Sequence, residues 1–265
     1  MYETRDLVLV LMSRVVQTGD MPQSKTTALI AQSLHMSRFG TYATAAGGDM
    51  DLALRLYLWN IELAGAFHSS LGLLEVILRN TIDAELRAWN ASQSQPDGTP
   101  YPPDWLIDPA RPLNTLTASA RKTATQNAVK ARAARPASHP RKHAPITHDD
   151  ILAQLTFGVF VRLLPTPDSA DKTFRARQVL WQEALIAAFP GSRSDPDGHI
   201  AADRAGRLLS LRNRVAHMEP LLGVNATARH RDAVRLVGSI NPDLQGWFAG
   251  VTRVREVARE RPDTQ

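Results

Sequence analysis

The sequence predicts an all-α protein built as a helical bundle. Apolar residues recur every three or four positions in several long segments, which is the spacing of one face of a helix. Repeated alternation of apolar and polar residues, the pattern of a half-buried β-strand, is absent from the sequence. The chain has 265 residues, of which 43% are hydrophobic, so it is long enough to bury a sizeable core. We expect additional helices around the bundle and one basic, loop-rich insertion.

The first segment, residues 1–23, is expected to be an N-terminal extension. Its apolar residues follow helical spacing, and a polar turn at residues 19–22 ends it. The organised domain is then predicted to cover residues 24–265. It begins with a short amphipathic helix at residues 27–34, and Gly47 and Gly48 break the chain before the next helix.

The longest helix is predicted over residues 53–89. Asp49 or Asp51 can cap it by accepting its free backbone N–H groups. Glu75 lies beside the apolar face of this helix, where a carboxylate needs a cationic or hydrogen-bonding partner. It either pairs with Arg79 one turn further on or takes a direct part in a functional site. The apolar face itself is one continuous stripe, formed by Phe67, Leu71, Leu74, Leu78, Ile82, Leu86 and Trp89.

Residues 91–146 are predicted to be a basic insertion. Ser, Gln, Pro, Asp and Gly dominate residues 91–112, which are expected to form a loop, and residues 115–134 can be helical. From residue 109 to residue 148 there are Lys and Arg side chains but no Asp or Glu. This strip either contacts RNA phosphates or is a solvated, partly mobile insertion. Its candidate RNA-binding residues are Arg121, Lys122, Lys130, Arg132, Arg135, Arg141 and Lys142.

Further helices are expected after the insertion. The first begins at Thr147, which is a good N-cap, and Pro165 follows its end near residue 163. The others are predicted over residues 174–189, 200–217, 226–238 and 243–259.

Composition excludes several classes of site. The chain has no cysteine, so disulfides, thiolate nucleophiles and cysteine-based metal centres are excluded. The sequence has no Gly-rich phosphate loop or nucleophilic serine motif, and its histidines form no His-x-x-x-His pair on a predicted helix. We therefore expect neither a metal ion nor a cofactor. The formal net charge of +5 favours anionic partners such as nucleic acid.

Nothing in the sequence indicates a secretory signal or a membrane span. The apolar run at residues 7–12 is bracketed by charged residues and is too short to cross a bilayer. We expect a soluble protein of the cytoplasm.

The helix over residues 200–217 ends with the residues best suited to chemistry. Asn213 and His217 are four positions apart and share a helix face, and the long side chain of Arg212 can reach the same pocket. Imidazole exchanges protons near neutral pH, and guanidinium can bind phosphate and stabilise developing negative charge. These groups suit metal-free RNA cleavage by attack of the 2′-OH, which leaves a 2′,3′-cyclic phosphate. From spacing alone, a structural role at a helix C-terminus, where a cation is favourable, is the simpler interpretation.

Several stretches together point to a known family. The most specific is Leu-Arg-Asn-x-x-x-His-x-Glu-Pro at residues 211–220, preceded by Glu-x-x-x-Arg-Asn at residues 75–80. The others are Ser37-Arg38-Phe39-x-x-Tyr42, Leu56-Tyr57-Leu58-Trp59-Asn60, Phe157-Gly158, Leu180-Trp181 and Ala188-Phe189-Pro190. Over roughly residues 26–225 the chain thus resembles the Abi-like proteins, the abortive-infection family of AbiD/AbiF type within the HEPN superfamily.

The resemblance implies a HEPN-like bundle that acts as a metal-independent endoribonuclease. Such a protein would be an RNA-cleaving toxin of a phage-defence or toxin–antitoxin-like system, commonly a homodimer. The motif's functional pair would be Arg212 and His217, with Asn213 as its polar companion. The residues expected to support this site are Glu75, Arg79, Asn80, Arg214 and Glu219.

Two other functions fit the sequence. One is a non-catalytic RNA-binding HEPN module that is held by a small antitoxin or a regulatory RNA, as the basic strip suggests. The other is a structural or partner-binding helical protein, in which Arg212, Asn213 and Glu75 form a buried polar network. A His217 side chain that is enclosed and fully hydrogen-bonded would favour this last interpretation.

Overall fold

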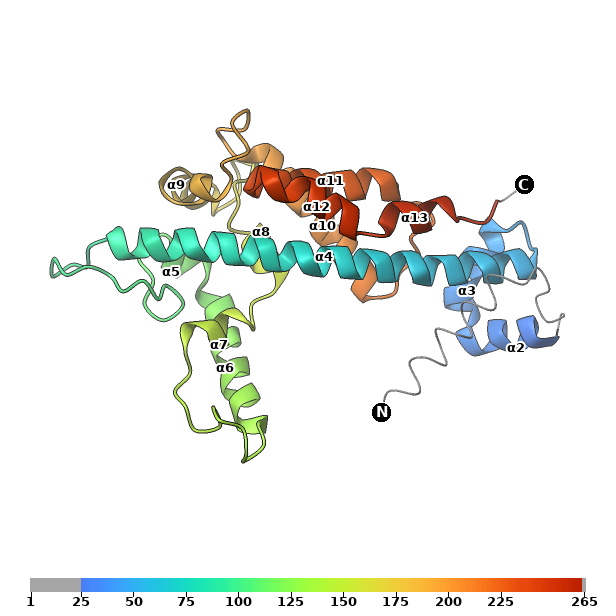
Figure 1. The fold of residues 1–265 in the computed structure, drawn as a ribbon, viewed down its shortest axis with the longest axis horizontal. Coiled ribbons are helices and arrows are strands. Elements are labelled where there is room, and N and C mark those ends of the chain that lie inside the picture. The colour runs from blue at the N-terminus through green and yellow to red at the C-terminus, as the bar shows by residue number, and fades with distance from the viewer. Residues whose placement is uncertain (1–24, 264–265) are drawn as a thin grey trace.

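The computed structural model describes residues 25–263, and this part of the chain is all-α (Figure 1). It contains twelve α-helices and one short 3-10 helix, and its only β-type pairing is an isolated bridge between Ser94 and Pro100. The predicted fold class is therefore confirmed. The predicted extension at residues 1–23 lies outside the described residues.

The long helix α4, Met50–Ser92, is the element on which most helices of the bundle pack (Figure 1). All seven residues of the predicted apolar stripe are buried. Asp49 rather than Asp51 caps the helix, because its carboxylate accepts the backbone N–H groups of Asp51 and Leu52 at 3.0 and 2.9 Å. The helix begins three residues before the start expected from periodicity, because a periodic pattern locates a helix better than it locates the ends.

The helices α10 (His199–Ala216), α11 (Ala226–Ile240) and α13 (Val254–Arg259) pack against α4 and form the bundle. Near the start of α4, the side chain of Asn60 accepts the backbone N–H of Leu221, just after α10. Near its end, the Trp89 indole donates to Glu183, which precedes α10. These two contacts show that α10 runs antiparallel to α4.

Three predicted helices are each divided in two. The segment expected at residues 147–163 forms α7 (His148–Leu152) and α8 (Phe157–Val161). The segment expected at residues 174–189 forms α9 (Phe174–Glu183) and the 3-10 helix η1 (Leu185–Ala188). The last one divides into α12 (Pro242–Val251) and α13.

The break between α12 and α13 shows why periodicity missed these divisions. Thr252 is extended, and its hydroxyl bonds the ring of buried His230 at 2.7 Å. The turn directs Val254 and Val257 into the core, where the Trp59 indole donates to the Val257 carbonyl at 2.8 Å. Tertiary contacts therefore decide where this helix stops.

The predicted insertion forms an arm that projects from the bundle (Figure 1). It contains α5 (Leu113–Leu116) and α6 (Ala118–Ala134), and α7 packs against α6. Buried Asp83 of α4 fastens its base, because one carboxylate oxygen lies 2.8 Å from both the Trp105 indole nitrogen and His148 Nε2. The loop expected at residues 91–112 is present from residue 93 onward, and Trp105 within it is fully buried.

A small second cluster covers the first part of α4. The helices α2 (Lys25–Leu34) and α3 (Met36–Ala45) pack on it, and the sequence did not predict α3 as a helix. The buried residues of this cluster are Phe39, Tyr42, Ala46, Leu52, Ala53, Leu54 and Leu56.

Within the described residues, α4 is the only helix whose length and composition would allow it to cross a membrane. The core helix of a globular protein meets the same criterion, and α4 contributes a buried stripe to the main core. The expected cytoplasmic location stays a prediction.

Candidate functional site

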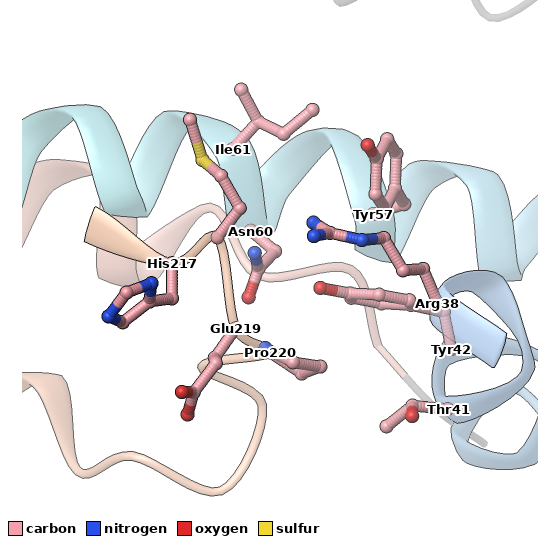
Figure 2. A pocket seen from close by; sticks show the side chains of 10 residues that line it. Arg38, Thr41, Tyr42, Tyr57, Asn60, Ile61, His217, Glu219 and Pro220 are labelled. Atoms are coloured by element: carbon pink, nitrogen blue, oxygen red, sulfur yellow. The ribbon is translucent and has the colours of Figure 1, made fainter. Parts of the chain in front are cut away.

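A pocket of about 400 Å³ lies where the small cluster meets the bundle (Figure 2). Its walls come from α3, from α4 and from the turn that follows α10. The lining residues are Arg38, Thr41, Tyr42, Tyr57, Asn60, Ile61, His217, Met218, Glu219 and Pro220. Arg38 and Tyr42 enter from one side, His217 and Glu219 from the other, and Asn60 lies between them.

Helical spacing brings the residues of α3 and α4 to this pocket. Arg38, Thr41 and Tyr42 of α3 are separated by three and four positions, so they share one face. Tyr57, Asn60 and Ile61 repeat this spacing on α4. Two helix faces that meet thus form a wall with a guanidinium, two phenols and an amide.

The turn after α10 presents His217 at the opposite wall. The backbone N–H of Met218 bonds the Val215 carbonyl at 3.1 Å, and that of Glu219 bonds the Arg214 carbonyl at 2.9 Å. This pair of bonds is the Schellman motif, which requires a left-handed residue directly after the cap. His217 is the cap, and Met218 is that residue, with φ of 54°.

Asn60 links the two walls. Its side chain is buried, and its Oδ1 accepts the backbone N–H of Leu221 at 2.6 Å. Because a backbone N–H can only donate, this bond fixes which end of the amide is oxygen. The amide nitrogen therefore remains available as a donor at the pocket.

Tyr42 is a hydrogen-bond donor throughout the physiological range. Burial and the neighbouring Tyr57 raise the pKa of its phenol to about 12, although nearby Arg38 opposes this shift. The two tyrosine rings meet edge to face at 5.3 Å, and Phe39 packs against both. This aromatic packing holds Tyr42 and Tyr57 in place beside Arg38.

Only one of the three predicted catalytic side chains lines the pocket. His217 is exposed there, and no side-chain hydrogen bond engages it within the described part of the chain. Asn213 is exposed and Arg212 is half-buried, and both lie on α10 outside the lining. The guanidinium inside this pocket is that of Arg38.

Two of the predicted supporting residues, Arg214 and Glu219, lie at the turn after α10. Arg214 donates to the Pro220 carbonyl and lies 3.5 Å from the Glu219 carboxylate. Glu219 also lines the pocket. Both therefore hold the segment that carries His217 against the end of α10.

The predicted supporting cluster lies elsewhere on α4. Fifteen residues separate Asn60 from Glu75, which at the rise of a helix is roughly 22 Å along its axis. Glu75 is half-buried rather than enclosed, and it forms no ion pair with Arg79 in residues 25–263. Arg79 instead donates to Asn80 at 3.4 Å. Exposure to water explains why Glu75 needs no internal cation.

Most cations of the predicted RNA-binding strip are engaged within the arm. Asp150 binds Arg135 at 3.1 Å and Arg141 at 2.6 Å. Lys142 donates to two backbone carbonyls of the chain around α6, and Arg132 donates to the Ala144 carbonyl.

Arg121 also donates hydrogen bonds within the arm, whereas two of the predicted lysines form none in residues 25–263. The Arg121 guanidinium donates to the Thr117 hydroxyl at 3.0 Å, and burial lowers its pKa. Among the seven candidates, Lys122 and Lys130 are exposed and form no side-chain hydrogen bond or ion pair with other described residues. The strip itself contains no acidic residue, but Asp150, two positions after it, supplies the carboxylate that pairs with Arg135 and Arg141.

Sequence reasoning missed Arg38, Tyr42, Tyr57 and Asn60 as site residues. The signal was available in their spacing of three and four positions. What the sequence does not show is that α3 crosses α4 next to the turn after α10.

Comparison with protein-family models, with curated proteins and with solved structures finds no significant match. Within the described residues, His, Asp and Glu side chains form no group of three or more that could hold a metal ion.

Proposed function

We propose that this protein is a metal-independent endoribonuclease of HEPN type, with His217 as its proton-transferring group. The observation that carries the proposal is the position of His217. Its imidazole is exposed, has no side-chain hydrogen bond in the described structure and faces a pocket with several hydrogen-bond donors. A histidine that only satisfied the core would be enclosed and bonded.

The reaction needs two proton transfers and stabilisation of charge on phosphorus. The 2′-oxygen of RNA loses its proton and bonds to the adjacent phosphorus. The bond from phosphorus to the 5′-oxygen breaks, and that oxygen takes a proton. His217 performs one of these transfers, while Arg212 stabilises the phosphate charge and Asn213 orients the phosphate or the imidazole.

The half-buried state of Arg212 and the exposure of Asn213 fit this assignment, because both side chains can meet a strand that approaches the end of α10. The family resemblance adds two further elements to the proposal. One is a homodimer in which the motifs of two copies combine. The other is a toxin role in abortive phage infection.

The test is cleavage of single-stranded RNA in the presence of EDTA. We expect the wild type to cut and His217→Ala to be slower by about 100- to 10,000-fold, which is the usual contribution of acid–base catalysis. The product should carry a 2′,3′-cyclic phosphate, and DNA of the same sequence should remain intact.

The matched control is His68→Ala. His68 is also exposed, but it lies on α4 outside the pocket lining, so its removal should leave the rate unchanged. Equal cleavage by wild type and His217→Ala, or none by either, would overturn the catalytic assignment.

A further inference from the structure

The pocket contains more binding groups than proton transfer by His217 requires. Arg38 is exposed, and its guanidinium forms no hydrogen bond or ion pair within residues 25–263. The Asn60 amide nitrogen and the Tyr42 hydroxyl also face the space between the walls, and Tyr57 lines it (Figure 2). These groups are donors, and the only carboxylate in the lining, Glu219, is close to Arg214.

The other property of the pocket is its apolar wall. Tyr57, Ile61, Met218 and Pro220 line it together with the donors. Met218 is 63% exposed, which leaves its flexible, polarisable side chain open to a ligand. A flat apolar group and an anion can therefore be bound side by side.

We propose that this pocket binds one nucleotide of an RNA strand, with its phosphate at Arg38 and its base against Tyr57 and Met218. The proposal rests on the ribonuclease function, for which this nucleotide would be a neighbour of the one that is cut. It assigns Arg38, Tyr57 and Asn60 a role in substrate binding.

The chemistry of a nucleotide matches both halves of the pocket. Guanidinium binds phosphate with charge-assisted hydrogen bonds, and aromatic side chains stack with bases of any sequence. The Asn60 amide can donate to an acceptor on the base edge, because its oxygen is already used by Leu221. A volume of about 400 Å³ lies within the range of small-ligand sites.

Tyr42 reinforces this preference for an anion. Its phenol is neutral at physiological pH, as that of an ordinary tyrosine would be, and its O–H can donate to the phosphate. A lone inorganic phosphate would leave the apolar wall unused, and a purely apolar ligand would leave the donors near Arg38 unpaired.

The test is calorimetric titration of the full chain with AMP, adenosine, inorganic phosphate and a 2′-O-methyl trinucleotide. The methyl group blocks the attacking oxygen, so binding is measured without cleavage. We expect AMP to bind more tightly than adenosine or phosphate, and the trinucleotide to bind at least as tightly as AMP. Arg38→Ala should weaken AMP binding by about tenfold or more, since one charge-assisted contact is lost.

The control for charge is Arg55→Ala. Arg55 is an exposed arginine of α4 outside the lining, and its removal should not change AMP binding. Tyr57→Leu, which keeps an apolar side chain, should weaken AMP and adenosine binding but leave phosphate binding unchanged.

Failure of this proposal is distinguishable from failure of the ribonuclease. RNA cleavage without AMP binding, or equal AMP binding by wild type and Arg38→Ala, would overturn the nucleotide site alone. A trinucleotide that binds more weakly than AMP would overturn its assignment to an RNA strand. AMP binding that survives Arg212→Ala, while cleavage is lost, would support both assignments.

Discussion

Met218 has a left-handed backbone conformation that a side chain with a Cβ atom disfavours. Glycine is the usual residue at this position of the Schellman motif, because it has no Cβ. Here the position belongs to methionine, whose side chain lines the pocket. The unfavourable backbone is thus found where the chain presents a candidate ligand contact.

Replacement of this residue should make the protein more stable. We expect Met218→Gly to raise the free energy of unfolding by up to about 1 kcal/mol, because relief of the left-handed strain exceeds the added entropy of the unfolded chain. Urea denaturation measures the change.

The matched control is the nearby Ala216→Gly, at an exposed position in the right-handed helix. It should lower stability by about 0.5–1 kcal/mol. A decrease for Met218→Gly as well would contradict the interpretation of strain at Met218.

At the scale of single residues, the sequence predicted part of the candidate site. Residue chemistry and the family resemblance singled out His217, whereas its spacing alone favoured a structural role at a helix C-terminus. Arg38 and Asn60 could not, because periodicity identifies a face of a helix but not the element that packs next to it. The Asn60 bond to Leu221, 161 positions away, is the kind of contact that only the fold reveals.

At the scale of elements, α10 begins at a glycine that the packing requires. Gly198 caps the helix with φ of 70°, and an added Cβ would lie 2.5 Å from the ring of Trp181. Trp181 is fully buried and cannot move aside without disturbing the core. By contrast, a Cβ at Gly206 in the middle of α10 would meet no neighbouring atom within 4 Å.

These two glycines of one helix should respond oppositely to alanine. We expect Gly198→Ala to lower the free energy of unfolding by about 2–3 kcal/mol, through overpacking and a disfavoured φ. Gly206→Ala should raise it by about 0.5–1 kcal/mol, since alanine favours a helix interior. Thermal and urea unfolding would test both, and equal signs for the two variants would refute the contrast.

Helix existence was predictable for most of the chain, but helix breaks were not. The spacing of apolar residues in α12 and α13 is compatible with one continuous helix. The bond between Thr252 and His230 lies in the break and comes from a different helix, α11. Similarly, the cap at Thr147 could be read from sequence because all its partners lie within three residues.

At the scale of the whole molecule, the carboxylate of Asp150 holds several groups of the arm together. Asp150 bonds the backbone and hydroxyl of Thr147, and it also binds Arg135 and Arg141. These bonds, the backbone one above all, lower the pKa of Asp150 to about 2. The positive charge of this region thus has an internal counterion.

Acid should therefore loosen the arm. Because the pKa of Asp150 is lower in the folded than in the unfolded chain, its stabilisation is present above about pH 4 and is lost as the pH falls toward 2. We expect Asp150→Asn to be less stable than wild type by about 1–2 kcal/mol at pH 7, with the difference shrinking toward pH 2. Melting curves across this range provide the measurement.

The control for this experiment is Asp149→Asn, at the exposed neighbouring residue. Asp149 forms no ion pair within the described structure, so the variant should differ little from wild type at any pH. A constant gap between wild type and Asp150→Asn from pH 7 to pH 2 would show that the carboxylate does not act through its charge.

The position of the pocket between two separately packed clusters has a consequence for its dynamics. Arg38 and Tyr42 lie on α3, which packs in the small cluster, whereas His217 follows a helix of the main core. A cluster that buries few side chains opens at a lower free energy than the whole domain. Local opening of α2 and α3 would then remove one wall of the pocket while α10 stays folded. Any ligand held by both walls would slow this opening, and amide hydrogen exchange in α3 would fall on binding.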